Sequence, residues 1–296
     1  YFTWWTVPSY HVIRSGWVGS EAFVLAFSTG IPAARFGHAN YFWHTTADTM
    51  DKSNPRNLKY LGVIVATCAY FIANAGEKES IYLAHLSASR GKSEIANATQ
   101  QEIEKLADSD PSHQPEAFYD SLDQIGFVRD TQLRAMESVL RLVPRGGRKQ
   151  VATVIRGLKR SLRKAAAAEV GRLAEVAGLP RSAVRERPEK GLSYLEEQLQ
   201  SIVPQRKNVA FLSRLARVPK DQWEGHQPSI FVTKLLYWCD DKRNLLEACR
   251  LTAREVRLRE GGTTPTLEEI GRRLGAREQN VLEYFKFLKK YGYVDW

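Results

Sequence analysis

The sequence predicts an α/β fragment, the end of a larger domain, followed by a mainly α-helical extension with a C-terminal winged helix-turn-helix. Short apolar and aromatic runs alternate with helical periodicity in residues 1–76, a pattern typical of an α/β domain. Residues 77–250 show helical periodicity and few β-favouring runs. Residues 251–296 contain two short helical patterns and a β-favouring end. We therefore expect three regions, with boundaries after residues 76 and 250.

Length and composition exclude several classes of protein. With 296 residues, 26% of them charged, and a mean hydropathy of −0.38, the chain is neither disordered nor collagen-like. Its three cysteines make no disulfide framework and have no zinc-finger spacing, which favours the cytoplasm. The longest uncharged run, residues 60–76, is shorter than the roughly 20 residues of a membrane span, so we expect a buried helix. Because Tyr1 stands in a β-favouring run, we expect no signal peptide and a start within a domain.

The first region reads as strands and helices in order. The expected elements are short strands at residues 2–5 and 10–13, a helix over residues 20–27 and a buried strand at residues 31–36. Asn54 before Pro55 then predicts a capped helix start, and Gly76 predicts its end. Apolar residues recur at helical spacing in this last helix and predict a stripe that packs on a sheet: Leu58, Leu61, Val65, Cys68, Ala69 and Ile72.

Charge is unevenly distributed along the chain, whose net charge is +10. Residues 94–130 hold nine acids and two bases, whereas residues 144–190 hold thirteen bases and four acids. We favour the interpretation that these two blocks face each other within one domain. The alternative is that the basic block binds a nucleic acid or an anionic membrane.

Residues 150–169 predict a basic amphipathic helix. Residues 181–191, with Pro180 and Pro188, predict a linker or loop. One face of the helix is apolar, with Val151, Val154, Ile155, Leu158 and Leu162. The other face carries bases, namely Arg156, Lys159, Arg160, Arg163 and Lys164.

The C-terminal region predicts a helix-turn-helix. Thr266 with Glu269 forms a capping-box pattern, Gly275 ends this helix, and a second helix is expected over residues 278–290. The residues expected to point inward are Leu267, Ile270, Leu274, Val281, Phe285 and Leu288. Residues 250–296 have a net charge of only +3, and acids stand at the start of the second helix. We therefore favour a structural or dimer-forming module over a DNA reader.

One long sequence motif resembles a motif of a known protein family. Residues 30–33 read G-I-P-A, residues 44–52 read H-T-T-A-D-T-M-D-K, and an Asn-Pro helix start follows. This order resembles the C-terminal part of the catalytic domain in the co-catalytic zinc aminopeptidases, the family that includes the glutamate carboxypeptidase and transferrin-receptor ectodomains. The resemblance covers about a quarter of the chain. It implies a hydrolase that removes N-terminal residues from peptide substrates with two bound zinc ions.

The resemblance implies roles for specific residues. His44 falls on the position of the last zinc ligand, and a neutral imidazole suits zinc. Asp48 falls on the motif's aspartate and either orients the histidine loop or caps the turn after Thr45. Glu21 stands where many relatives have Asp, and His38 matches no ligand position. We interpret His38 and the four remaining histidines as structural: His11, His85, His113 and His226.

The sequence also departs from the family pattern. The family's two zinc ions need an earlier His, a bridging Asp, a Glu-Glu pair and a further Asp, all far upstream of the final His. This chain has no such residues at such positions, so we assign it no catalytic residue and expect it to be inactive alone. Its own acid pairs, Glu196-Glu197 and Glu268-Glu269, follow the motif and are interpreted as solvated helix faces.

A second, shorter resemblance lies at residues 236–251, where an aromatic run and a charged turn precede a helix. It is similar to a segment in the long C-terminal extensions of some bacterial members of the same family. We interpret Tyr237 and Trp238 within it as core residues. The leading hypothesis is thus the C-terminal portion of a zinc aminopeptidase. The alternative is a nucleic-acid-binding or regulatory protein that uses the basic helix and the winged helix.

Overall fold

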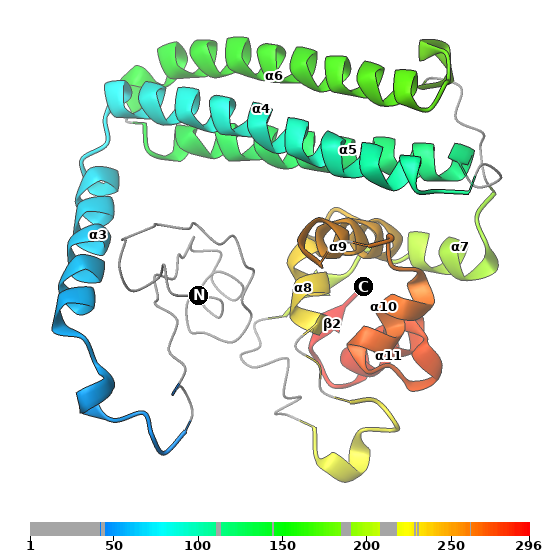
Figure 1. Ribbon diagram of the computed structural model, residues 1–296. Coiled ribbons are helices and arrows are strands. Elements are labelled where there is room, and N and C mark those ends of the chain that lie inside the picture. The colour runs from blue at the N-terminus through cyan, green and yellow to red at the C-terminus, as the bar shows by residue number, and fades with distance from the viewer. Residues whose placement is uncertain are drawn as a thin grey trace. The chain divides into compact units, whose positions relative to one another are not determined.

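The computed structural model describes most of the chain after residue 41. The described residues are 42, 45–110, 114–143, 145–184, 191–207, 218–227, 229, 231–260 and 262–296. Within them the protein is mostly helical, with one small two-stranded sheet. The chain divides into two compact units, one of residues 35–190 and one of residues 1–34 with 191–296, and each is described by itself. Figure 1 labels the elements.

Several predictions fall outside these residues. The expected strands at residues 2–5, 10–13 and 31–36 and the helix over residues 20–27 lie there, so the α/β character of the first region stays a prediction. The mainly helical character of residues 77–250 is confirmed at those of them that the structure describes. Residue 250, where we placed a boundary, lies inside helix α9 (Leu245–Glu260), and both boundaries stay predictions.

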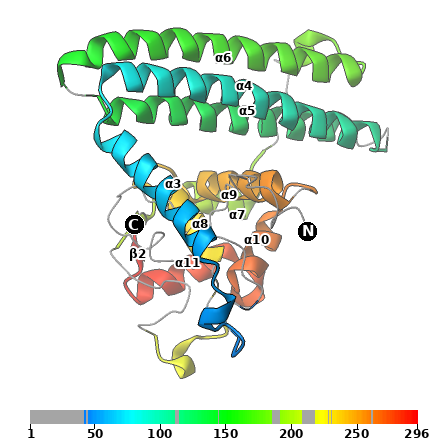
Figure 2. The same cartoon turned by 60° about the vertical axis from the view of Figure 1, so that its left-hand side comes forward.

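Helix α3 (Pro55–Ala73) begins where the sequence predicts. The Asn54 side chain accepts hydrogen bonds from the backbone N–H groups of Arg56 at 2.9 Å and Asn57 at 3.4 Å, and Pro55 occupies the first turn. The helix ends at Ala73, with Asn74 as its C-cap, before the predicted Gly76, which instead precedes helix α4 (Glu77–Ala107). Figure 2 shows α3 projecting from the end of α4.

The predicted burial of α3 is wrong for this structure. None of its residues is buried, and its apolar side chains are exposed by up to 73% at Tyr70 and 61% at Leu58. No layer of described residues covers the apolar stripe; the sheet expected to do so would come from residues outside the described part of the chain. Among the described residues no single helix is long and apolar enough to cross a membrane; α3 and α4 meet that test only together, across a 118° bend.

Three long helices form a bundle in the unit of residues 35–190, which we call the first unit: α4, α5 (Gln114–Ser138) and α6 (Arg148–Val176). They lie side by side and pack pairwise (Figure 1). Gly91 allows a close approach at the centre, because a Cβ there would lie 3.1 Å from the Gln132 Cβ and 3.2 Å from a Leu162 methyl. The core of the bundle is apolar and includes Ala84, Ala88, Ile95, Phe118, Ile125, Met136, Val151, Ile155 and Leu162. The predicted basic amphipathic helix is therefore confirmed as α6.

The two charged blocks lie in helices that contact each other, as predicted. Helices α4 and α5 carry the acidic block, and α6, which packs on both, carries most of the basic block. Lys159 of α6 forms an ion pair with Glu137 of α5 at 2.7 Å. Glu137 lies outside the acidic block, which ends at residue 130. Within the block, Glu94 pairs with Arg90 of its own helix at 3.4 Å. The helices are thus neighbours, but these bridges do not join the two blocks.

The second unit, which includes residues 191–296, contains five α-helices among its described residues. They are α7 (Tyr194–Gln200), α8 (Phe231–Trp238), α9, α10 (Leu267–Leu274) and α11 (Val281–Lys290). Strand β1 (Gln205–Arg206) pairs antiparallel with β2 (Val294–Asp295), with Arg206 opposite Val294. Buried aromatic side chains at Tyr284, Phe285 and Tyr293 fill its core.

The predicted capping box and turn are confirmed. The Thr266 hydroxyl accepts a hydrogen bond from the Glu269 N–H at 3.2 Å, and the Thr266 N–H donates to the Glu269 carboxylate at 2.8 Å. Gly275 ends α10 with φ of 73°, and its Cβ position lies 2.8 Å from the Gln227 carbonyl oxygen, so this site needs glycine. Helix α11 begins at Val281, later than the predicted residue 278, because the Asn280 side chain caps it.

Candidate functional site

The loop that resembles the peptidase motif has a defined local structure at its described residues. The Thr45 hydroxyl donates a hydrogen bond to the Phe42 carbonyl oxygen at 2.6 Å and accepts one from the Ala47 N–H at 3.3 Å. The Asp48 N–H donates to the Thr45 carbonyl oxygen at 3.1 Å. This turn is therefore capped by its threonine, as such residues cap turns elsewhere.

The end of the same loop is a short 3-10 helix, Met50–Lys52. The Thr49 hydroxyl and the Lys52 ammonium group both bind the Asp51 carboxylate, and these contacts hold the pKa of Asp51 below its usual range, with the lysine as the larger cause. Lys52 also lies 5.7 Å from the centre of the Phe42 ring. Contacts between side chains thus join Phe42, at the start of the loop, to Lys52, at its end. The Asn54 cap of α3 follows two residues later.

The metal ligand implied by the resemblance cannot be placed. His44, His38 and Glu21 lie outside the described residues, so their geometry is not described. Asp48 is exposed, and both interpretations of its carboxylate stay predictions. Within the described part of the chain, no group of three or more His, Cys, Asp or Glu side chains could hold a metal ion. The described residues therefore do not form a zinc site.

The two glutamate pairs serve as helix caps and surface residues. Glu196 accepts a hydrogen bond from the Ser193 N–H at 2.9 Å and binds Arg250 at 3.0 Å, and these contacts, the serine N–H first, lower the pKa of its carboxyl. At the start of α10 the Glu269 carboxylate likewise accepts a hydrogen bond from the backbone N–H of the capping residue, Thr266. Their neighbours Glu197 and Glu268 are exposed. Neither pair lies in a setting suited to a general base.

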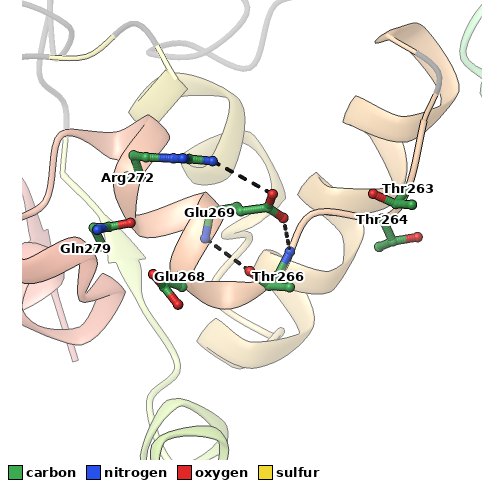
Figure 3. A pocket seen from close by; sticks show the side chains of 7 residues that line it. All are labelled: Thr263, Thr264, Thr266, Glu268, Glu269, Arg272 and Gln279. Atoms are coloured by element: carbon green, nitrogen blue, oxygen red, sulfur yellow. Dashed lines mark hydrogen bonds and ion pairs between the residues drawn. The ribbon is translucent and has the colours of Figure 1, made fainter.

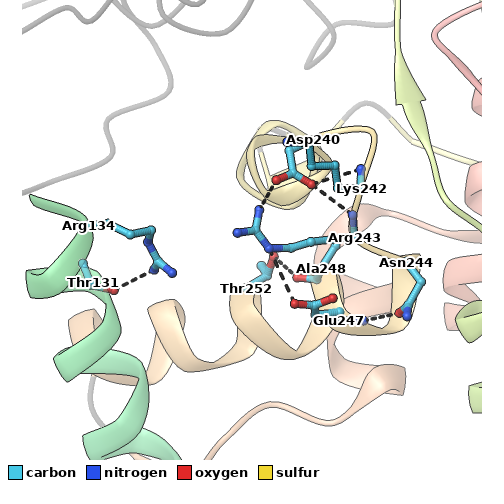
Figure 4. A network of polar contacts seen from close by, with 9 residues as sticks. All are labelled: Thr131, Arg134, Asp240, Lys242, Arg243, Asn244, Glu247, Ala248 and Thr252. Atoms are coloured by element: carbon cyan, nitrogen blue, oxygen red, sulfur yellow. Dashed lines mark hydrogen bonds and ion pairs between the residues drawn. The ribbon is translucent and has the colours of Figure 1, made fainter. Parts of the chain in front are cut away.

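The charged turn before α9 is a network centred on Asp240 (Figure 4). Its carboxylate accepts hydrogen bonds from the Arg243 N–H at 3.0 Å and from the Arg243 guanidinium at 2.6 Å. Asn244 caps α9 by accepting a hydrogen bond from the Glu247 N–H at 2.9 Å.

Trp238 is buried as predicted, and its indole N–H donates a hydrogen bond to Glu255 at 2.9 Å. The prediction for Tyr237 is wrong: the helical period turns it outward, and it is 53% exposed.

The lysines on the surface of α11 form ion pairs with carboxylates. Lys286 pairs with Glu283 at 2.8 Å, Lys289 with Asp295 at 3.4 Å, and Lys290 with Glu224. The carboxylate of Glu224 raises the pKa of Lys290. A helix that reads DNA presents cations and hydrogen-bonding groups towards phosphates and base edges. Here each lysine of α11 already has a carboxylate partner.

An open depression of about 540 Å³ lies beside the start of α10 (Figure 3). Three threonines, two glutamates, Arg272 and Gln279 line it. Thr266 and Glu269 are bound to each other there, and Glu269 is also 3.7 Å from Arg272. Three of the seven lining residues, Thr266, Glu269 and Arg272, are thus bound to one another at the start of α10.

His226 is a structural residue, as predicted, and its contacts come from residues distant in sequence. Its Nδ1 accepts a hydrogen bond from the Arg277 N–H at 3.0 Å, and its ring contacts Tyr284 and Phe287. The sequence gives no spacing signal for this contact, since the partners are 51 residues apart.

Comparisons of the chain with protein-family models, with curated proteins and with solved structures give no significant match. The interpretation of the site therefore depends on its own residues and on the motif.

Proposed function

We propose that this chain is the C-terminal portion of a zinc-dependent aminopeptidase and is inactive by itself. The observation that supports this most directly is the order of the motif H-T-T-A-D-T-M-D-K and the Asn-capped helix that follows it. The activity implied by the resemblance is hydrolysis of the N-terminal peptide bond by metal-activated water.

The local structure of the loop supports the proposal. A ligand on a loop needs neighbours that hold the loop in one conformation. Here Thr45 closes the turn after His44, and Asp51 fixes Thr49 and Lys52 just before α3. Such a loop is preorganised directly after the histidine that the resemblance assigns to zinc.

The exposed apolar surface of α3 also supports it. Large apolar side chains on one helix are seldom left in water, and contiguous exposed patches mark surfaces that bind something. On the apolar stripe of α3, Leu58, Val65 and Ile72 are exposed by 61%, 39% and 54%. In the proposed enzyme this helix is the last of the catalytic domain and packs on its sheet.

The described residues do not fit a zinc pair, and we derive no catalytic step through one. Two co-catalytic zinc ions need several N or O ligands, of which this sequence offers only His44 by family position. The remaining ligands would come from upstream sequence in the intact enzyme. The role of Asp48 in that enzyme would be to orient the His44 loop.

We assign the last helices a structural role. The arrangement of α10, the Gly275 turn, α11 and the paired strand β2 supports a winged helix-turn-helix. The neutralised lysines of α11 favour a packing or dimer-forming role over DNA reading through this helix.

The proposal is tested in two forms of the protein. The 296-residue chain should bind zinc no better than a single exposed histidine in calorimetry and should not cleave a leucyl-anilide. In a longer protein that includes upstream sequence, His44→Ala should lose zinc and activity together. His85→Ala is the matched control, because His85 is an exposed histidine on α4, and it should change neither.

Two results would refute the proposal. Turnover with stoichiometric, sub-micromolar zinc by the 296-residue chain would mean that it holds a site of another kind. An unchanged zinc content in the longer His44→Ala protein would remove His44 from the ligand set.

A further inference from the structure

Helix α6 carries a stripe of exposed cations on the side opposite its buried face. At 3.6 residues per turn, five bases fall within an arc of about 100° and extend over about 22 Å of helix. We call these residues the α6 stripe: Lys149, Arg156, Arg160, Arg163 and Lys164, all exposed. The buried side chains Val151, Ile155 and Leu162 lie on the opposite side and face α4 and α5.

The α6 stripe lacks the neutralisation found elsewhere on the protein. Among the described residues, no carboxylate lies within ion-pair distance of any of its five bases. The Arg156 guanidinium donates a hydrogen bond to the Thr153 hydroxyl at 2.9 Å. By contrast, Lys159, just beside the stripe, pairs with Glu137, and the lysines of α11 pair with Glu283, Asp295 and Glu224. The charge of the stripe is therefore available to an external anion.

The shape of this surface favours a linear polyanion over a membrane. An amphipathic helix binds a bilayer by inserting its apolar face. The apolar face of α6 is occupied by the bundle, as Val151 and Leu162 are completely buried. Between the cations the stripe presents Thr153 and Gly157, without an aromatic or large aliphatic side chain to insert.

We propose that the α6 stripe binds the phosphate backbone of a nucleic-acid duplex without sequence specificity. Duplex DNA carries one negative charge per about 1.7 Å of its axis, so a row of cations about 22 Å long can meet several phosphates. Three of the five bases are arginines, whose guanidinium groups bind phosphate through two parallel hydrogen bonds. This inference does not depend on the proposed peptidase activity.

The test measures binding of the 296-residue chain to a fluorescent duplex of about 20 base pairs at several salt concentrations. If three to five phosphates are neutralised, the slope of log K against log salt lies between about −2.7 and −4.5. The triple variant Arg156→Gln, Arg160→Gln, Arg163→Gln should lose at least about tenfold in affinity at low salt, and its slope should shrink by about 2.7. Circular dichroism checks that the bundle still forms.

A matched variant distinguishes loss of the α6 stripe from a general decrease in the positive charge of the chain. Arg272→Gln, Lys286→Gln, Lys290→Gln removes the same three charges from cations that already have carboxylate partners, and it should bind the duplex nearly as the unmodified chain does. An equal loss in both triple variants would overturn the proposal, as would no binding at low salt. Tighter binding to phosphatidylserine vesicles or to polyglutamate than to the duplex would assign the stripe to a membrane or an acidic protein and would also overturn it.

Discussion

The imidazole of His226 and the backbone N–H of Arg277 are joined by a hydrogen bond of 3.0 Å, across 51 residues of sequence. The histidine is 5% exposed, and its ring centre lies 5.4 Å from that of Tyr284 and 4.7 Å from that of Phe287. Because Nδ1 accepts a hydrogen bond, this ring nitrogen carries no proton and the ring is neutral in the folded chain. The bond holds the segment before α8 against the turn between α10 and α11.

The second unit should therefore lose stability in mild acid. Burial lowers the pKa of His226, Arg277 acts in the same direction, and the carboxylates of Glu224 and Glu283 oppose it. Since an unfolded histidine titrates near 6.5, the unfolded chain takes up a proton at a higher pH than the folded chain does. The stabilisation is complete above about pH 6.5 and declines as the pH falls below that value, by at most about 1.4 kcal/mol per pH unit.

The control for this prediction is His226→Asn. An asparagine carbonyl can accept from the Arg277 N–H but does not titrate, so the variant loses packing energy while its stability depends less on pH between 5 and 6.5. Hydrogen exchange at the amides of α11, measured for both proteins over this pH range, gives the two slopes. Identical slopes would show that the neutral His226 does not contribute to acid sensitivity.

Substitution by alanine should change the free energy of unfolding in opposite directions at two helical glycines, Gly271 and Gly157. At Gly271 in α10 an added Cβ would lie 1.7 Å from the Gln279 carbonyl oxygen, so Gly271→Ala should destabilise the second unit by about 3 kcal/mol. At Gly157 in α6 nothing lies within 4 Å, so Gly157→Ala should stabilise the bundle by about 0.5–1 kcal/mol through helix propensity. Hydrogen exchange reports each unit separately. Equal effects of the two substitutions would contradict this difference in packing.

Local signals in the sequence predicted local structure well. Asn54-Pro55, the Thr266–Glu269 pair and Gly275 each act within a few residues, and the structure has a helix start or end at each of them. The apolar period of α6 placed Val151, Ile155 and Leu162 in the core for the same reason. These features depend on backbone hydrogen bonds and helix periodicity, which one short segment determines.

Long-range contacts were not predictable in the same way. The partner of Lys159 is Glu137, on another helix, and nothing in the sequence distinguishes it from the acids of residues 94–130. The exposure of Tyr237 and of α3 depends on which surfaces other segments cover, and an apolar pattern does not specify the covering element. For the candidate site, the motif identified His44 and Asp48, but the geometry of a metal site depends on residues distant in sequence.

The capping box of α10 should contribute measurably to the second unit. Thr266→Ala removes the acceptor for the Glu269 N–H and should cost about 1 kcal/mol. Thr263→Ala, at an exposed threonine nearby, should change the free energy of unfolding by less than about 0.5 kcal/mol. Hydrogen exchange within α10 measures both. A cost at Thr266 no larger than that at Thr263 would mean that the cap is not formed in solution.

The three cysteines should differ strongly in reactivity. Burial raises the pKa of Cys239 to about 12 and also raises that of Cys249, and both side chains are fully buried, so neither thiolate is available near pH 8. Cys68 lies on α3, where no residue is buried. An aromatic disulfide reagent should therefore modify one thiol of the native chain rapidly and the other two only as the chain unfolds.

Cysteine variants identify that rapid thiol and connect it with the proposed enzyme. Cys68→Ser should abolish the fast phase, whereas Cys239→Ser should leave it intact. Cys68 belongs to the apolar stripe of α3, which in the proposed longer enzyme packs on the catalytic sheet, so its modification there should become slow. Fast modification of Cys68 in both proteins would mean that α3 stays uncovered and would count against its assignment to the peptidase domain.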